Sequence, residues 1–395
     1  MLWEADVKAT CPSLSLAVWL ISGFALLSGC STVGSWFQSD KPVVQPATLL
    51  DFKPTLVMKP AWQGNVGASG AFAFSPASDG QAVYAAGQDG RIVKFDLASG
   101  REVWHIDAGQ PLSAGVGVGA GLVLVGTTKG ELLAYRSSDG SRTWVARLSG
   151  EILVPPVATE GGVAARSNDG RVYLLDAATG KQRWVTSRTL PALTLRQQGH
   201  LLLTPDVLYV GHAGGRLSAL AVNNGAPQWE ANVSLPRGAT EIERVSDVTG
   251  PLAADGRRVC GSAYQGRIAC FDAQRGTLIW MRDASVLRGV EMDERMVYAA
   301  DVGGNLMAFD KLRGTHPWKL DKLHDRDLST PVAVHSRYLA VGDFQGQVHI
   351  INSDDGTFAA RQPTDGSAIK GVPLVLKAGV VVQTINGGVF SFRFE

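Results

Sequence analysis

The chain has 395 residues, and its 37 basic and 36 acidic side chains leave a formal net charge of +1 at pH 7. This balance provides no basic footprint for a nucleic acid, so we expect none among the partners. The 46 glycines and the 45% of hydrophobic residues are typical of a folded, glycine-rich β protein.

The beginning of the chain is typical of an export signal. The apolar run SLSLAVWLISGFALLSGC ends with small residues directly before Cys30, and it is too short and wrongly flanked for a membrane span. Small residues before a cysteine resemble the bacterial lipobox, whose cysteine becomes the lipidated N-terminus, and Ser31 after it implies sorting to the outer membrane. The alternative is an ordinary signal peptide with an unrelated cysteine. We predict a signal peptide over residues 1–29 and a lipid anchor at Cys30.

Residues 30–55 lack periodicity and contain three prolines, which predicts a flexible tether between the anchor and a folded domain over residues 56–395. Each buried CH₂ of a lipid chain contributes about 0.8 kcal/mol, so a multiply acylated cysteine would hold the protein at a membrane surface.

A repeated pattern fills the rest of the chain. In the copy DGRVYLLDAATGKQRW (169–184), an Asp-Gly turn, an alternating strand and a Thr-Gly turn lead to Trp184. Six copies place a glycine fourteen residues before a tryptophan: Gly90, Gly130, Gly170, Gly215, Gly266 and Gly304 precede Trp104, Trp144, Trp184, Trp229, Trp280 and Trp318. Two degenerate copies begin at Gly346, with Ala360 in place of the tryptophan, and at Gly388, close to the end of the chain.

The repeats predict an all-β fold, an eight-bladed β-propeller of four-stranded antiparallel blades. Each unit contains a hairpin around its first glycine, a second turn before the tryptophan, and an apolar strand upstream. Units of this kind with a period near 40 residues stack radially as blades. We expect each tryptophan to pack across neighbouring blades, because a buried aromatic ring provides a large contact area.

Trp62 lies one period before Trp104 but has no hairpin of its own, while the last repeat ends before its tryptophan. We therefore expect the segment around Trp62 to supply the outer strand of the last blade and to close the ring.

The stretch GVGVGAGL (115–122) superficially suggests a phosphate-binding loop. A dinucleotide fingerprint needs a helix after the glycines, whereas another strand, LVLVG, follows here. We interpret these glycines as part of a tightly packed inner strand.

Two consecutive junctions between repeats are longer than the others. The interval from a tryptophan to the next turn glycine is 31 residues after Trp184 and 37 after Trp229, against 24 to 28 elsewhere. The first insertion (residues 187–200) and the second insertion (residues 234–250) should project side by side from the face of the Asp-Gly turns, and insertions in repeat proteins often mark the binding face.

The first insertion contains Leu190, Leu193, Leu195 and Arg196, and the second contains Glu241, Glu243, Arg244 and Asp247. Apolar anchors beside arginine are typical of the centres of protein interfaces. The alternative is that the leucines fill inner strands and the charges only solvate a loop. For the two insertions together, we favour a binding site.

Catalytic chemistry is not apparent in the sequence. The seven histidines are scattered without zinc-ligand spacing, and the Asp-Gly pairs lack the spaced carboxylates of a calcium loop. Cys260 and Cys270 lie on the two strands of one hairpin. An oxidising compartment would allow them to form a disulfide, but we favour two small, buried, unlinked residues.

The segment DAATGKQRW (176–184) resembles the tryptophan-docking motif of the eight-bladed quinoprotein dehydrogenases, in which the motif is structural. Many members carry adjacent cysteines over the quinone, and this chain has no such pair. The motif therefore predicts the scaffold and not the activity.

The lipobox, the eight repeats and the stretches LPALTLR and ERVSDV resemble the BamB family of lipoproteins, which belong to the β-barrel assembly machinery of Gram-negative outer membranes. The resemblance spans the mature chain and implies that the two insertions bind a POTRA domain of BamA. By motif, the contact residues are Leu193, Leu195, Arg196 and Asp247. Thr249 stands at a second acidic position of the family, so Glu241 or Glu243 is expected to replace that contact.

The resemblance implies a scaffold without enzymatic activity or cofactor. It would be lipid-anchored in the outer membrane, face the periplasm, and act as a monomer within a hetero-complex. It would contact other Bam subunits indirectly and help unfolded outer-membrane proteins to fold and insert. The alternatives are a periplasmic quinoprotein-like (PQQ-dependent) dehydrogenase and an adaptor for another envelope complex.

Overall fold

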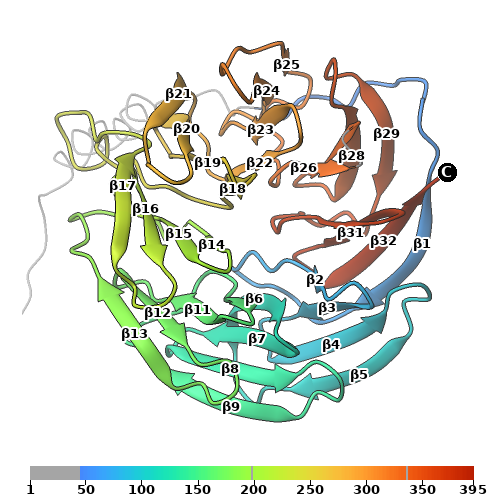
Figure 1. Ribbon diagram of the computed structural model, residues 1–395. Coiled ribbons are helices and arrows are strands. Elements are labelled where there is room, and N and C mark those ends of the chain that lie inside the picture. Colours follow the sequence, from blue (N-terminus) through green and yellow to red (C-terminus); the bar gives the residue numbers. More distant parts are fainter. Residues whose placement is uncertain (1–44, 197–198, 335–336) are drawn as a thin grey trace, which may run out of the picture. The chain divides into compact units, whose positions relative to one another are not determined.

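The computed structural model describes residues 45–196, 199–334 and 337–395. In these residues the regular structure consists of β-strands, without a helix. The strands group into eight four-stranded antiparallel sheets, which surround a central axis as blades (Figure 1). The predicted all-β, eight-bladed propeller is confirmed.

Blade 1 consists of β2 (Ala77–Ser78), β3 (Ala82–Ala86), β4 (Arg91–Asp96) and β5 (Glu102–Asp107), and blade 2 of β6 (Leu112–Gly119), β7 (Leu122–Thr127), β8 (Glu131–Arg136) and β9 (Arg142–Arg147). Blade 3 consists of β10 (Val157–Thr159), β11 (Gly162–Arg166), β12 (Arg171–Leu175) and β13 (Gln182–Ser187), and blade 4 of β14 (Leu201–Leu203), β15 (Val207–Gly211), β16 (Arg216–Ala221) and β17 (Pro227–Asn232). Blade 5 consists of β18 (Ala253–Ala254), β19 (Arg258–Ser262), β20 (Arg267–Asp272) and β21 (Leu278–Asp283), and blade 6 of β22 (Val290–Met292), β23 (Met296–Ala300), β24 (Leu306–Asp310) and β25 (Trp318–Leu320). Blade 7 consists of β26 (Val332–Val334), β27 (Tyr338–Gly342), β28 (Gln347–Asn352) and β29 (Phe358–Pro363), and blade 8 of β30 (Leu374–Leu376), β31 (Gly379–Gln383), β32 (Gly388–Phe394) and β1 (Met58–Asn65).

Within a blade, the first strand lies nearest the centre and the fourth lies on the outside (Figure 1). The second strands are buried on both faces, as in β11, whereas the outer strands alternate between buried and exposed side chains, as in β13. The hydrophobic core therefore lies between successive blades, and every blade depends on its two neighbours.

The ring is closed by β1. This strand pairs antiparallel with β32 at the outer edge of blade 8, where Trp62 lies opposite Ser391. Figure 1 shows the first strand beside the last one, although they come from the two ends of the ring. The prediction that the segment around Trp62 completes the last blade is confirmed.

The tryptophans join each blade to the next, as expected. The indole N–H of Trp144 donates to the carbonyl of Ala177 at 2.8 Å, and the ring covers Gly180, whose φ is +69°. A Cβ atom at Gly180 would lie 2.6 Å from ring atoms, so only glycine fits. The other indole donors and carbonyl acceptors are Trp62 and Leu97, Trp104 and Ser137, Trp184 and Val222, Trp229 and Ala273, Trp280 and Lys311, and Trp318 and Ser353.

The absence of a tryptophan at position 360 follows from the closure. In blade 8 the third strand, β32, and the fourth strand, β1, belong to opposite ends of the ring, so no turn connects them. Backbone N–H groups of Thr55 and Leu56 instead donate to the carbonyl of Ala359, at 2.9 and 3.2 Å. A tryptophan at position 360 would therefore have no glycine turn to cover.

Residues 47–52, within the segment predicted as a tether, contact the ring. The carbonyls of Ala47 and Leu50 accept hydrogen bonds from Arg326 and Arg361, at 2.9 and 3.0 Å. Phe52 stacks on Phe358 with ring centroids 5.2 Å apart. The tether thus remains a prediction for residues 30–44, which lie outside the described residues together with the signal peptide and Cys30.

The glycine-rich stretch 115–122 falls largely in β6, the inner strand of blade 2. Cβ atoms at Gly117 and Gly119 would lie 1.9 and 2.2 Å from the carbonyl oxygens of Pro156 and Ala158. The glycines therefore allow two inner strands to approach closely, which confirms the interpretation as a packed inner strand.

The interpretation of Cys260 and Cys270 as unlinked residues was wrong. The register of β19 and β20 places the two cysteines directly opposite each other, with Cα atoms 4.1 Å apart, and they form a disulfide. Both are fully buried within the core of blade 5. The sequence could not fix the register, because a shift by one residue would have turned the side chains to opposite faces.

Reduction of this disulfide is expected to lower the free energy of unfolding by about 2–3 kcal/mol, because an open chain gains conformational entropy when unfolded. Urea denaturation with and without a reductant measures the change. The double variant Cys260→Ala/Cys270→Ala is the control and should not respond to the reductant. Equal midpoints for the wild-type protein under both conditions would contradict the prediction.

Candidate functional site

The two insertions lie side by side on one face of the ring. Each joins the outer strand of one blade to the inner strand of the next, so both share the face of the Asp-Gly turns. They are in direct contact, because the backbone N–H of Leu195 donates to the Asp247 carboxylate at 2.7 Å. Gly199 and Gly250 also form a parallel β-bridge at their bases.

Asp247 connects three segments beneath this surface. Its second carboxylate oxygen accepts the backbone N–H of Gly214, in a turn of blade 4, at 2.9 Å. The side chain is only 3% exposed, and burial raises the pKa of its carboxyl group although the two N–H donors oppose this shift. Asp247 therefore holds the insertions together from inside.

Arg166 fixes the base of the first insertion. Its guanidinium is buried and donates to the carbonyls of Gly199 and Gly211, at 3.1 and 2.6 Å. Burial lowers the pKa of Arg166 to about 10, and the negative charge of Asp247 partly opposes this shift. A buried charge is tolerated only where hydrogen bonds and an opposite charge compensate it.

The second insertion has a buried base and an exposed tip. Residues 245–250 are buried and residues 235–244 are exposed. The Glu243 carboxylate accepts the N–H groups of Ala239 and Thr240, at 2.7 and 3.0 Å, which lowers its pKa and fixes the turn. Arg244 pairs with Glu241 at 2.9 Å. Thr249 is buried, so Glu241 and Glu243 are the accessible acids of this insertion.

Apolar and basic side chains line a groove between the insertions. Its volume is about 420 Å³, and Leu190, Pro191, Leu235 and Pro236 contribute to its walls. Three larger apolar side chains of the two insertions remain exposed to solvent: Leu193 at 42%, Leu235 at 55% and Ile242 at 69%. Leu235 lines the groove, and the other two lie on the same pair of adjoining insertions. Exposed apolar groups that are concentrated on neighbouring loops are typical of a binding surface.

Arg196 lies on the same face, and its side chain is 63% exposed. One of its terminal nitrogens pairs with Glu151 at 2.5 Å, and its guanidinium lies over the ring of Phe72 at 5.3 Å. Leu195 is half-buried beside it, and its backbone N–H donates to the Asp247 carboxylate.

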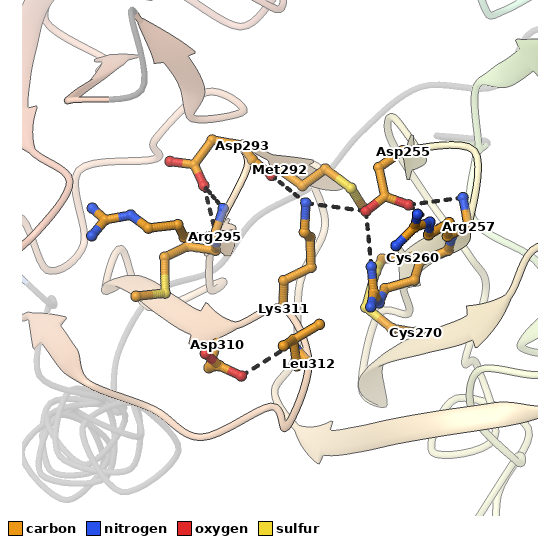
Figure 2. A network of polar contacts seen from close by, with 12 residues as sticks. Asp255, Arg257, Cys260, Cys270, Met292, Asp293, Arg295, Asp310, Lys311 and Leu312 are labelled. Carbon is orange, nitrogen blue, oxygen red and sulfur yellow. Dashed lines mark hydrogen bonds and ion pairs between the residues drawn. A yellow bond between two sulfur atoms is a disulfide. The ribbon is translucent and has the colours of Figure 1, made fainter.

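A second hollow lies on the opposite face, between blades 5 and 6. Lys311 extends there from the turn after β24 and pairs with Asp255 at 3.0 Å, and it donates to the carbonyl of Asp293 at 2.8 Å (Figure 2). Asp255 also accepts Arg258 at 3.1 Å. Because these charges satisfy one another, the network joins two blades, and we assign it no ligand.

Among the described residues, no group of three or more His, Cys, Asp or Glu side chains is arranged to hold a metal ion. The same part of the chain contains no helix with the length and hydrophobicity of a membrane span.

The structure brings Leu193, Leu195, Arg196 and Asp247 together, with Glu243 on the neighbouring tip. Sequence reasoning missed five residues: Phe72, Glu151, Leu235 and Ile242 on this surface, and the buried Arg166 beneath it. Leu235 and Ile242 could have been found, because both lie in the exposed segment of the second insertion. The other three come from distant parts of the chain and carried no local signal.

The family model of the outer membrane protein assembly factor BamB matches residues 88–320 and 302–394. The outer membrane protein assembly factor BamB of Nitrosomonas eutropha is 40% identical over 393 residues, which cover 97% of this chain and 96% of that protein. The crystal structure of BamB from Moraxella catarrhalis superimposes with a TM-score of 0.78 at 26% identity, covering 86% of this chain and all of that one.

The quinohemoprotein alcohol dehydrogenase of Comamonas testosteroni shares the fold at 13% identity, with a TM-score of 0.67 over 85% of this chain and 76% of that one. At this identity the likeness shows the fold alone. The extensive match to the family model and the near-complete coverage of a 40% identical relative lead to one conclusion: this chain belongs to the BamB family of outer membrane protein assembly factors.

Proposed function

We propose that this protein is a non-catalytic subunit of the machinery that assembles β-barrel proteins in the outer membrane, and that its two insertions bind a POTRA domain of BamA. Family membership supports the role in outer-membrane protein assembly. The observation that supports the binding site is the exposure of Leu193, Leu235 and Ile242 on two adjoining loops, with Leu235 in the wall of the groove between them. Buried hydrogen bonds hold these loops in place.

The exposed residues provide what a stable interface needs. Binding would bury the apolar side chains of Leu193, Leu235 and Ile242 and so remove their surface from water. Arg196 would add directional hydrogen bonds. A few such residues usually carry most of the binding free energy. Asp247 would act by keeping the insertions together, and Glu243 by shaping the exposed tip.

The cellular setting is part of the proposal. A lipid on Cys30 would anchor the protein to the outer membrane, and the ring would face the periplasm as one copy within a hetero-complex. There it would contact other Bam subunits indirectly and assist unfolded outer-membrane proteins. No observation favours a quinoprotein-like dehydrogenase beyond the shared fold.

Affinity purification of the tagged, full-length protein from detergent-solubilised outer membranes tests this function. We expect BamA, a barrel protein with POTRA domains, to be recovered with it in near-equal amount. Recovery of the ring without such a protein would contradict the proposal. Absorbance of a bound quinone in the purified protein would instead support the dehydrogenase alternative.

A further inference from the structure

Two side chains from other loops hold the guanidinium of Arg196. Glu151 lies in the loop before β10 and forms an ion pair with Arg196, with the nitrogen and oxygen atoms 2.5 Å apart. Phe72 lies in the loop between β1 and β2, and the centre of its ring is 5.3 Å from the guanidinium carbon. Three junctions, before blades 1, 3 and 4, thus meet at one exposed arginine.

Both supporting side chains are themselves fixed. The Glu151 side chain is only 16% exposed, and its second oxygen accepts the side-chain amide of Asn168 at 3.4 Å. Its carbonyl accepts the backbone N–H of Asn168 at 2.8 Å. Phe72 packs edge-on against Phe74, which is 2% exposed within the core between blades 1 and 2. The two side chains that contact Arg196 are therefore held in place by other residues of the ring.

Arg196 keeps most of its binding capacity in this arrangement. Its side chain is 63% exposed, and one terminal nitrogen pairs with Glu151. Among the described residues, its other N–H groups have no hydrogen-bond acceptor. The guanidinium is thus held on one face and at one corner, while the remaining donors are accessible to another protein.

We propose that Phe72 and Glu151 are positioning residues that order Arg196 before the partner arrives; this inference rests on the proposed function. A free arginine side chain loses considerable rotamer freedom when a partner immobilises it, and this loss weakens binding. Stacking on an aromatic ring and a charge-assisted hydrogen bond remove much of that freedom in advance. The partner surface that fits has a carboxylate or carbonyl group facing the exposed edge of Arg196.

A double-mutant analysis of binding tests the proposal. Full-length protein in detergent is applied to immobilised, detergent-solubilised BamA, and the Kd is measured for Phe72→Leu and Glu151→Gln. Each substitution is expected to weaken binding about two- to ten-fold, whereas Phe72→Tyr, which retains the aromatic face, binds as the wild type does. In an Arg196→Ala background, neither substitution should weaken binding further.

Matched controls come from elsewhere in the ring. Glu160→Gln changes an exposed glutamate on the opposite face of blade 3, and Phe344→Leu removes the ring beneath Arg326, a similar stack in blade 7. Both should leave the Kd unchanged, and thermal midpoints verify that every variant is folded.

Three outcomes would overturn the inference while the proposed function stands. Phe72→Leu and Glu151→Gln could bind as the wild type does, or weaken binding equally with and without Arg196. Tighter binding by Glu151→Gln would show that Glu151 competes with the partner for Arg196. If the wild-type protein does not bind BamA at all, the proposed function itself fails.

Discussion

Replacing Trp184 with alanine is expected to lower the free energy of unfolding by about 3–5 kcal/mol. Trp184 lies in β13 and is only 8% exposed, and its indole N–H donates to the carbonyl of Val222 in blade 4 at 2.8 Å. Alanine would leave a cavity at the junction and an unpaired carbonyl beneath it. Chemical denaturation measures the loss as a lower midpoint.

Val185→Ala provides the comparison for this prediction. Val185 is the next residue of the same strand, but 43% of its side chain is exposed and it faces away from the junction. A loss within about 0.5 kcal/mol is expected, as for most surface substitutions. If the two variants unfolded at the same denaturant concentration, the tryptophan would not be the link between blades.

Replacing Leu193 with aspartate is expected to weaken binding to BamA at least thirty-fold, roughly 2 kcal/mol or more, as at an interface hot spot. The side chain is 42% exposed in the free ring, so the charge costs little before binding. In the complex it would be buried against an apolar surface without a partner, which is costly. Titration of the purified proteins gives the Kd, and thermal unfolding gives the stability.

Leu312→Asp is the matched control, because Leu312 is 57% exposed and belongs to a turn on the opposite face. It should alter neither the affinity nor the stability. A large loss of folding in Leu193→Asp would show that Leu193 belongs to the core. Equal affinities of the two variants would place the binding site elsewhere.

The architecture of the ring could be predicted because its determinants are local and repeated. A glycine turn and a tryptophan at a constant spacing specify each junction, and Trp62 without a hairpin indicated how the ring closes. Ala360 departs from this pattern, and the structure explains why. A tryptophan at this position would cover a turn between the third and fourth strands of blade 8, and blade 8 has no such turn. The pairing of Cys260 with Cys270 depended on a strand register that their positions did not reveal.

The candidate site was predictable only in part. The lengths of the two insertions located it, since length changes between repeats occur in loops. The family resemblance implied that Asp247 contacts the partner, and the structure shows that its carboxylate is buried and accepts backbone N–H groups of two other loops. Phe72 and Glu151 approach Arg196 only because the junctions of several blades meet on one face.

Site-specific photo-crosslinking in living cells tests the central claim most directly. A photoreactive amino acid is placed at position 242, where Ile242 is 69% exposed on the tip of the second insertion, and at position 312 on the opposite face. We expect a crosslink to the POTRA region of BamA from position 242 and none from position 312. A crosslink to BamA from position 312 alone would contradict the proposed binding face.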